Sequence, residues 1–300
     1  MSDFARSNPP GPATLRQLLS RDQLLTVPGC YDGLGARLIE QAGFSAAYLT
    51  GFGSSASLLG RPDIGLLSAT EMVDSARRLV MATSLPIIAD ADTGYGNPLN
   101  VIRTVRDYER AGVGALQLED QVTPKRCGHM DDKAVIPSQD MVAKIRAAVS
   151  ARTDPDLVII ARTDARAVEG FDAALARAGS YVEAGADVLF IEALRHPDEF
   201  AAAASRGFGV PLVYNWVEGG KTPLLSADEI SKLGYRILLL PISILLRATE
   251  AMRAVLDEIH TEGTPRIPAS GGESDHDPFA AFNQFVGLPE ILDLQRQFTS

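Results

Sequence analysis

The sequence predicts an α/β fold, a (β/α)8 TIM barrel that forms one domain over residues 1–300. Eight short apolar runs alternate with longer stretches of helical spacing, and polar residues recur where the runs end. Strict alternation of strand and helix favours a closed barrel over an open doubly wound sheet. A chain of 300 residues is also a normal length for one barrel.

The apolar runs are short and apolar enough to be strands buried on both faces. In chain order they are LLTVP (24–28), AAYLT (46–50), PIIAD (86–90), GALQLE (114–119), LVIIAR (157–162), DVLFIE (187–192), PLVYN (211–215) and RILLLP (236–241). Helical candidates between them include EMVDSARRLVMAT, NVIRTVRDYERAG, DMVAKIRAAVSAR, FDAALARAGSYVEAG and ADEISKLG. Several of these end on Gly, which is common just after a helix.

Polar residues follow six of the predicted strands. In a barrel these residues meet at one mouth, where barrel enzymes have their active sites. The alternative for any one of them is a polar side chain that leaves a strand for a loop. Acidic residues are depleted from strands, so six such ends together favour a site. The ends carry Thr50 and Gly51, Asp90 and Asp92, Glu119 and Asp120, Arg162 and Asp164, Glu192, and Asn215.

Two segments lie outside the eight units. An N-terminal extension of about residues 1–22 contains the helical candidate TLRQLLS. A C-terminal helical arm of about residues 262–300 follows the last unit, with the polar segment TEGTPRIPASGGESDHDPF and then the helix-like stretch FNQFVGLPEILDLQRQF. A helix on such a tether packs either on its own barrel or on a neighbouring subunit, and the sequence leaves both open.

The composition restricts partners and location. A net charge of −10 and a pI near 4.9 argue against nucleic acid or an anionic membrane as partner. We expect a cytoplasmic protein, because no apolar run approaches a membrane span and the first residues lack the apolar core of a signal peptide. Free thiols are then expected at Cys30 and Cys127 rather than a disulfide, and neither has the neighbours of a zinc site.

The segment ADADTGYGN predicts a metal site. It places Asp90 and Asp92 two residues apart at a strand end, so that both face the barrel mouth. Carboxylate oxygens with room for water suit a hard cation such as Mg²⁺, and Glu119 could orient a metal-bound water. The alternative is an Asx turn before Gly94. The nearby Glu119 and Arg162 favour the metal.

Several segments together resemble the isocitrate lyase and phosphoenolpyruvate mutase superfamily, in register from about residue 14 to 295. They are IADADTGYGNPLNV, LEDQVTPKRCGHM, IARTDAR, GRPDIGLLS and NWVEGGKTP. The resemblance is strongest to the short-chain lyase branch, which acts on 2-methylisocitrate, 2,3-dimethylmalate and related compounds and includes the petal-death-type proteins. KRCGH is specific to this branch, because the mutase and decarboxylase branches lack the cysteine.

The resemblance implies a Mg²⁺-dependent lyase, with Mn²⁺ as the alternative ion, in a homotetramer whose last helix is exchanged between subunits. It implies that Asp90 and Asp92 contact the metal and that Asp63 and Glu119 hold metal-bound waters. Tyr48 matches a tyrosine near the substrate hydroxyl. The matching substrate-binding positions are Thr50, Gly51, Phe52, Arg162, Glu192 and Asn215, with Phe52 in place of a smaller residue.

Cys127 is predicted to protonate the carbanion left when the C2–C3 bond of a 2-hydroxydicarboxylate breaks. Neighbouring cations are expected to draw the thiol pKa towards neutrality and to offset the charge of the leaving fragment. The alternative is a buried inert thiol, which the cationic setting disfavours here and which is retained for Cys30. The predicted catalytic set is Cys127, Tyr48, Lys125, Arg126, His129 and Arg162.

The expected substrate is a malate with alkyl groups at C2 or C3. Methylisocitrate-type lyases bind a third carboxylate partly through an arginine at the position of Leu246; Arg247, one place on, points about 100° around a helix. Oxaloacetate-hydrolysing relatives usually have serine where Pro241 stands. A carbon–carbon lyase for substituted malates is therefore the leading prediction. An oxaloacetate hydrolase or decarboxylase, a methylisocitrate lyase, a phosphonate-active enzyme and a barrel that only binds dicarboxylates are the alternatives.

Overall fold

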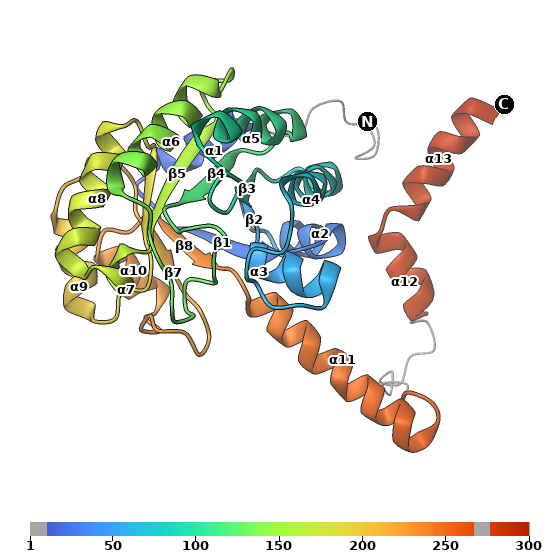
Figure 1. Cartoon of the computed structure of the whole chain (residues 1–300). Helices are drawn as coiled ribbons and strands as arrows, with labels where there is room; N and C mark the ends of the chain where they lie inside the picture. Colours follow the sequence, from blue (N-terminus) through green and yellow to red (C-terminus); the bar gives the residue numbers. More distant parts are fainter. Residues whose placement is uncertain (1–10, 267–276, 300) are drawn as a thin grey trace. The chain divides into compact units, whose positions relative to one another are not determined.

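Eight parallel strands lie at the centre of the barrel, and helices surround them (Figure 1). The structure, a computed structural model, describes residues 11–266 and 277–299. Each strand overlaps the run predicted for it. The strands are β1 (Leu25–Cys30), β2 (Ala47–Leu49), β3 (Ile87–Asp90), β4 (Ala115–Glu119), β5 (Val158–Thr163), β6 (Val188–Ile191), β7 (Val213–Asn215) and β8 (Ile237–Leu240).

The strands pair in the order β6-β5-β4-β3-β2-β1-β8-β7, and every ladder is parallel. Between β6 and β7 the ring is joined by a parallel bridge from Leu189 to Leu212, and Leu189 N donates to Pro211 O at 3.0 Å. The predicted (β/α)8 barrel is confirmed.

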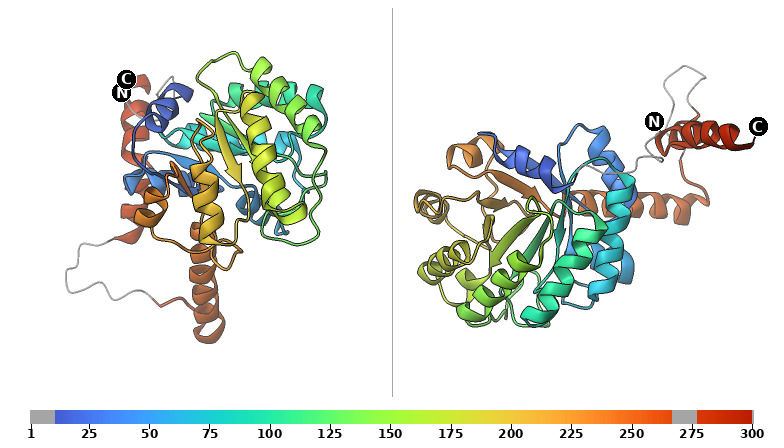
Figure 2. Two further views of the ribbon diagram at one scale, coloured as in Figure 1. Left: turned by 90° about the vertical axis from the view of Figure 1, so that its left-hand side faces the viewer. Right: turned by 90° about the horizontal axis from the view of Figure 1, so that it is seen from above.

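Helices surround the strands, as two further views show (Figure 2). They are α1 (Pro12–Leu19), α2 (Gly33–Gln41), α3 (Gly51–Ser54), the π-helix η2 (Ser55–Leu59), α4 (Ala69–Ala82), α5 (Pro98–Ala111), α6 (Ser138–Ala151), α7 (Ala165–Val168), α8 (Phe171–Glu183), α9 (Pro197–Ser205) and α10 (Ala227–Lys232). Local sequence sets their ends. Ser68 and Glu71 form a capping box that starts α4, and α5 stops where Gly112 adopts a φ of 90°.

The buried side chains form two layers on opposite faces of the strands. The inner layer fills the barrel and includes Val27, Tyr48, Ile160, Phe190 and Leu239. The outer layer joins strands to helices and includes Leu49, Leu116, Ile159 and Tyr181. Successive residues of a strand point to opposite faces, so burial of both faces explains why the strands are nearly continuous apolar runs.

The contacts divide the chain into two compact units. The barrel unit is Pro9–Leu245, and the second unit contains the described residues 246–266 and 277–299. It begins at residue 246, before the arm predicted from about residue 262. Its helices are α11 (Ser243–Glu262), which starts in the barrel unit, α12 (Pro278–Phe285) and α13 (Leu288–Thr299). None of the three contains a buried residue among those described.

The predicted last helix, residues 282–298, is two helices. Gly287 between them has a φ of 89°. Pro289 lacks the N–H that a continuous helix would use to bond Phe285 O, so the break follows from the sequence. Residues 267–276 of the predicted polar segment lie outside the described residues. Exchange of the arm between subunits stays a prediction.

No helix in residues 11–266 and 277–299 is both long and apolar enough to cross a membrane. The cytoplasmic location stays a prediction.

Candidate active site

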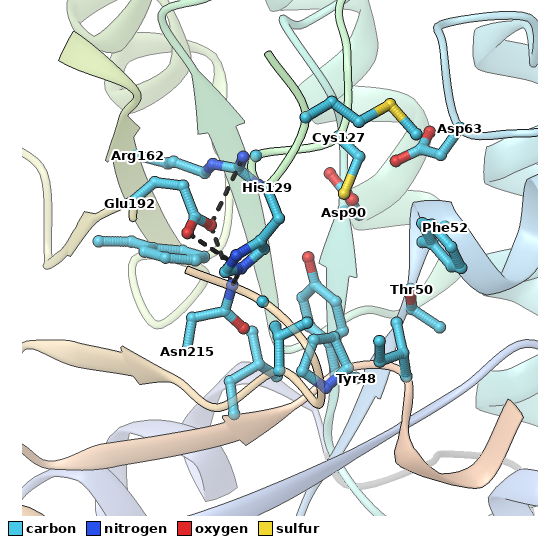
Figure 3. A pocket seen from close by; sticks show the side chains of 18 of the residues that line it. Tyr48, Thr50, Phe52, Asp63, Asp90, Cys127, His129, Arg162, Glu192 and Asn215 are labelled. Atoms are coloured by element: carbon cyan, nitrogen blue, oxygen red, sulfur yellow. Dashed lines mark hydrogen bonds and ion pairs between the residues drawn. The ribbon is translucent and has the colours of Figure 1, made fainter. Parts of the chain in front are cut away.

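A cavity of about 230 Å³ lies at the carboxyl ends of the strands (Figure 3). Its wall combines strand ends with the loops that follow β2, β4 and β7. Most of the residues predicted for the site line it, namely Tyr48, Thr50, Phe52, Asp63, Asp90, Cys127, His129, Arg162, Glu192 and Asn215. The barrel thus brings together residues from five of the six predicted strand ends, and the loop after β4 contributes Cys127 and His129 in place of the sixth.

Asp90, the last residue of β3, is held in place by backbone groups. Its Oδ1 accepts from Asp92 N at 3.1 Å, and its Oδ2 accepts from Gly51 N at 3.3 Å. Asp92 has a φ of 46°, a conformation that aspartate adopts more readily than most residues. The Tyr108 hydroxyl of α5 donates to Asp90 O at 2.9 Å. This turn brings both carboxylates to the cavity side of β3.

Lys125 joins the carboxylates from the loop after β4. Its Nζ lies 2.5 Å from Asp63 Oδ1 and 2.9 Å from Asp92 Oδ1, and its side chain is 4% exposed. Burial alone would lower the pKa of Lys125, but Asp92 and Asp63 raise it well above its usual value. The ammonium is therefore directed into the carboxylate cluster, which we define as Asp63, Asp90, Asp92 and Glu119.

Buried carboxylates outnumber buried cations around the cavity. The carboxylates are the cluster with Asp164 and Glu192, and the cations are Lys125, Lys133 and Arg162. Burial raises the pKa of Asp92 to about 6 and that of Glu119 well above its ordinary value. Two buried cluster oxygens, Asp92 Oδ1 and Glu119 Oε1, have no hydrogen-bond partner among the residues that the structure describes. Asp92 Oδ1 has only its ion-pair contact to Lys125.

This donor set fits a hard divalent cation, because excess negative charge and open carboxylate oxygens are what such an ion requires. Within the described residues, no three His, Cys, Asp or Glu side chains stand close enough to ligate one ion alone. An ion here would therefore need water or substrate oxygens among its ligands, which is usual for Mg²⁺.

Arg162, near the end of β5, is held by carboxylates on every side. Its Nε and Nη2 donate to Asp164 at 2.9 and 3.1 Å. Its Nη1 lies 3.3 Å from Glu119 Oε2, and its Nη2 lies 3.5 Å from Glu192 Oε2. The guanidinium also lies over the Phe190 ring, 5.1 Å from the centroid. Its position is thus fixed before any substrate binds.

His129, Glu192 and Asn215 form a hydrogen-bonded group beside Arg162 (Figure 3). Asn215 Nδ2 donates to Glu192 Oε2 at 2.9 Å, and His129 Nε2 lies 3.4 Å from Glu192 Oε1. His129 Nδ1 accepts from Lys221 N at 3.0 Å, which assigns the proton of the neutral ring to Nε2. Burial lowers the pKa of His129, so the ring is neutral near pH 7.

Cys127 lies half-buried in the loop after β4 and lines the cavity together with Asp90 (Figure 3). Its N donates to Asp63 O at 3.1 Å. Burial raises the pKa of the thiol to about 11, so the predicted fall towards neutrality is wrong. The residues that were expected to place positive charge beside the thiol do not do so. Lys125 points into the cluster, His129 is neutral, and Arg126 is half-exposed, with its Nη1 3.6 Å from Asp132 Oδ2.

The rest of the cavity wall is largely apolar. Its members are Phe52, Met130, Phe190, Val217, Leu239, Pro241 and Ile242. Tyr48 directs its hydroxyl towards the centre of the cavity and donates to Gln117 Oε1 at 3.2 Å (Figure 3). Burial raises the pKa of Tyr48 well above its usual value, so the hydroxyl stays protonated. The cavity thus combines charged groups with apolar side chains.

Two residues that shape the site, Gln121 and Lys133, were not predicted as members of it. Gln121 Nε2 donates to Arg126 O at 2.8 Å and Gln121 Oε1 accepts from Arg126 N at 2.9 Å, so this side chain pairs with the backbone as a strand would. Lys133 contacts Asp164 at 2.7 Å with a side chain that is 1% exposed. Its setting in MDDKAV resembles an exposed turn. The available signal for a buried lysine was the ARTDAR segment, because Asp164, two residues after Arg162, is a second carboxylate at the same strand end that needs a cation.

Comparison with known proteins gives close matches over nearly the whole chain. The profile of the family described as phosphoenolpyruvate phosphomutase matches residues 15–260. The 2,3-dimethylmalate lyase of Eubacterium barkeri is 44% identical over 96% of this chain and 98% of that protein. The 2-methylisocitrate lyase of Aeropyrum pernix is 45% identical over 84% of this chain and 80% of that protein.

Solved structures match equally well. A 2,3-dimethylmalate lyase has a TM-score of 0.89 at 38% identity, over 96% of this chain and 95% of that one. An oxaloacetate acetylhydrolase with 3,3-difluorooxalacetate has a TM-score of 0.88 at 36% identity, over 96% of each chain. A phosphonopyruvate hydrolase with oxalate and Mg²⁺ has a TM-score of 0.84 at 32% identity, over 96% of this chain and 99% of that one. With a matching family profile, relatives of this identity and the expected barrel, the chain belongs to the PEP mutase/isocitrate lyase superfamily.

Proposed function

We propose that this chain is a divalent-metal-dependent carbon–carbon lyase that cleaves a substituted malate, such as 2,3-dimethylmalate, into a 2-oxo acid and a carboxylic acid. The observation that carries the proposal is one cavity that is lined by a thiol, by carboxylates and by apolar side chains. Similarity to a 2,3-dimethylmalate lyase and a 2-methylisocitrate lyase supports the reaction class.

The carboxylate cluster is the proposed cation site. Asp90 and Asp92 would contact Mg²⁺, or Mn²⁺ in its place, and Asp63 and Glu119 would hold its water ligands. When bound, the cation would polarise the hydroxyl and carboxylate oxygens of the substrate. The buried Glu119 Oε1, which has no hydrogen-bond partner among the described residues, supports this assignment. The Mg²⁺ complex of phosphonopyruvate hydrolase, a superfamily neighbour, supports the choice of ion.

The substrate is proposed to lie in the cavity between Asp90 and Arg162. Thr50, Gly51 and Phe52 border one side, and Glu192 and Asn215 border the other. Arg162 provides a buried guanidinium towards a substrate carboxylate, and its partners keep it in one orientation. The apolar residues of the wall, with Leu239 and Pro241 among them, would pack against the alkyl substituents.

In the proposed reaction, the substrate hydroxyl loses its proton to a carboxylate of the cluster. The C2–C3 bond breaks, C2 becomes the carbonyl carbon of the 2-oxo acid, and the electron pair passes to C3. Cys127 Sγ then gives its proton to C3, which releases the carboxylic acid and leaves a thiolate. A thiol with a raised pKa is protonated at neutral pH and ready to donate, and the charge of Arg162 favours the thiolate that forms.

Hydrolysis of oxaloacetate is the second candidate, because an oxaloacetate acetylhydrolase is among the matched structures. Hydrolysis requires a water held beside the reacting carbonyl. Pro241 and Ile242 offer that water no side-chain hydrogen bond, which favours the lyase. The prediction that Leu246 replaces a partner of a third carboxylate stays open, because Leu246 belongs to the second unit.

A substrate panel tests the proposal. The protein is incubated with Mg²⁺ and 2-methylmalate, 2,3-dimethylmalate, 2-methylisocitrate or oxaloacetate in turn, and 2-oxo acid is followed as its phenylhydrazone. Separate assays follow oxalate and the disappearance of oxaloacetate. We expect 2-oxo acid release to be fastest from an alkyl-substituted malate. Oxalate release from oxaloacetate as the fastest turnover would replace the lyase with a hydrolase.

We also propose that the chain forms a homotetramer in which the arm packs on a neighbouring subunit. The support is the exposed apolar surface of α11, α12 and α13, where Phe279 is 77% and Leu256 is 63% exposed. Soluble proteins rarely leave so many apolar side chains uncovered. Sedimentation at micromolar concentration is expected to give a tetramer, and a monomer would contradict the proposal.

A further inference from the structure

Lys133 lies on the returning half of the loop that follows β4, and its side chain is buried. Its Nζ donates to two acceptors, the carbonyl of Gly128 within the same loop and Asp164 Oδ1 at 2.7 Å. Asp164 is itself fixed, because its N donates to Asp120 Oδ1 at 2.9 Å. Lys133 therefore ties the end of the loop that carries Cys127 to the barrel.

Asp164 is a shared anchor for the loop and for the cavity guanidinium. The same carboxylate accepts from Arg162 at 2.9 and 3.1 Å and from Lys133 at 2.7 Å. Although burial opposes it, these two cations lower the pKa of Asp164 to about 2, so the carboxylate stays charged. Lys133 and Asp164 therefore set the distance between Gly128 and Arg162, although neither of their side chains lines the cavity.

Gly128 shows how closely the loop approaches the cavity. A Cβ added at Gly128 would lie 2.3 Å from Arg162 Nη2 and 2.7 Å from Glu192 Cδ. The backbone next to Cys127 thus lies directly on the groups proposed to bind substrate. A small displacement of this backbone would move the thiol with it.

We propose that Lys133 is a positioning residue that holds residues 127–130 against Arg162 and so fixes the thiol of Cys127 for proton transfer. The effect on catalysis rests on the proposed lyase function. The effect on the position of the loop is independent of that function, because it follows from contacts that are present without substrate.

Lys221 provides a matched comparison. Its Nζ also binds this loop, at Asp131 Oδ1 and 2.6 Å, but the pair is exposed, with side-chain exposures of 24% and 86%. Exposed ion pairs contribute little, whereas hydrogen bonds from a buried charged group contribute much more. Loss of the Lys221 side chain should leave the loop in place.

The test compares Lys133→Met, Lys133→Gln, Lys133→Arg and Lys221→Met. The first readout is the rate at which iodoacetamide alkylates Cys127 in the substrate-free protein, measured by mass spectrometry. Cys30, buried and with its pKa raised to about 12, is the unreactive internal reference. The second readout is kcat and KM on the best malate, with the affinity for the 2-oxo acid product.

Lys133→Met should alkylate about 10- to 100-fold faster than the parent and lose a similar factor in kcat, because one buried charged hydrogen bond shifts an equilibrium by that much. Product affinity should change little. Lys133→Arg should recover most of the protection, and Lys221→Met should match the parent within about twofold. Lys133→Gln keeps a hydrogen-bond donor, so its alkylation rate and kcat should lie between those of Lys133→Met and the parent. This variant replaces Lys133→Met in the test if the Met variant does not fold.

Unchanged alkylation in a folded Lys133→Met or Lys133→Gln protein would overturn the proposal, as would an equal rise in Lys221→Met. Because alkylation needs no substrate, a parent protein inactive towards every malate would refute the lyase function and leave this test valid. Faster alkylation with unchanged kcat would also overturn the positioning role, since the loop would then move without affecting the reaction.

Discussion

Gly128→Ala should impair closure of the loop after β4 without lowering the stability of the fold. The added Cβ would lie 2.3 Å from Arg162 Nη2 and 2.7 Å from Glu192 Cδ, whereas ordinary contacts begin at 3.4 Å. Gly128 does not have a positive φ, so alanine brings no backbone strain. Arg162 and Glu192 cannot easily withdraw, because Asp164 and Asn215 hold them.

The size of the effect follows from the overlap. Overpacking costs about 1–3 kcal/mol, and each 1.4 kcal/mol is tenfold in an equilibrium, so the closed loop should become about 5- to 100-fold less populated. The loop can relieve the overlap by moving outward. We therefore expect kcat/KM to fall by about the same factor while the free energy of unfolding stays near that of the parent.

Steady-state kinetics on the best malate and urea denaturation provide the measurement. Gly179→Ala in α8 is the matched control, because an added Cβ there meets nothing within 4 Å. It should leave kcat/KM unchanged and stabilise the fold by about 0.5–1 kcal/mol. A Gly128→Ala enzyme within twofold of the parent would show that the reaction does not need the contact between Gly128 and Arg162.

Three further predictions concern the thiol, the cation and the fold. Cys127→Ser should lower cleavage by about 10² to 10⁴ while calorimetry still detects binding of the 2-oxo acid product; turnover within a few-fold of the parent would remove Cys127 as the proton donor. Exhaustive chelation with EDTA should abolish turnover and Mg²⁺ should restore it, so full turnover in the chelated protein would rule out the cation site. Ser68→Ala removes the capping box of α4 and should cost about 1 kcal/mol in urea denaturation, and no change would mean that the cap contributes nothing.

The barrel could be predicted because its strands are apolar on both faces and its catalytic end is polar. Each signal is local in the sequence. Asp90 and Asp92, for example, follow directly on a run that must be buried, so their place at the mouth needs no knowledge of the other strands.

The electrostatic environment of the thiol could not be predicted in the same way. Lys125 and Arg126 are adjacent in sequence, but their side chains contact different partners. One reaches Asp63, 62 positions earlier, and the other reaches Asp132 at the surface. The charge around Cys127 depends on such distant partners and on burial, and a list of sequence neighbours contains neither.

The paired hydrogen bonds between Gln121 and Arg126 imply that the loop after β4 has a stiff stem and a separate tip. The stem is held further by Val122 N to Ala134 O and Ile136 N to Asp120 O, both at 2.8 Å. Lys125 belongs to the stem and contacts the carboxylate cluster, while residues 127–130 belong to the tip and line the cavity. The two parts can therefore vary independently, so that related enzymes can differ in the tip, and thus in the cavity wall, while they keep the same carboxylate cluster.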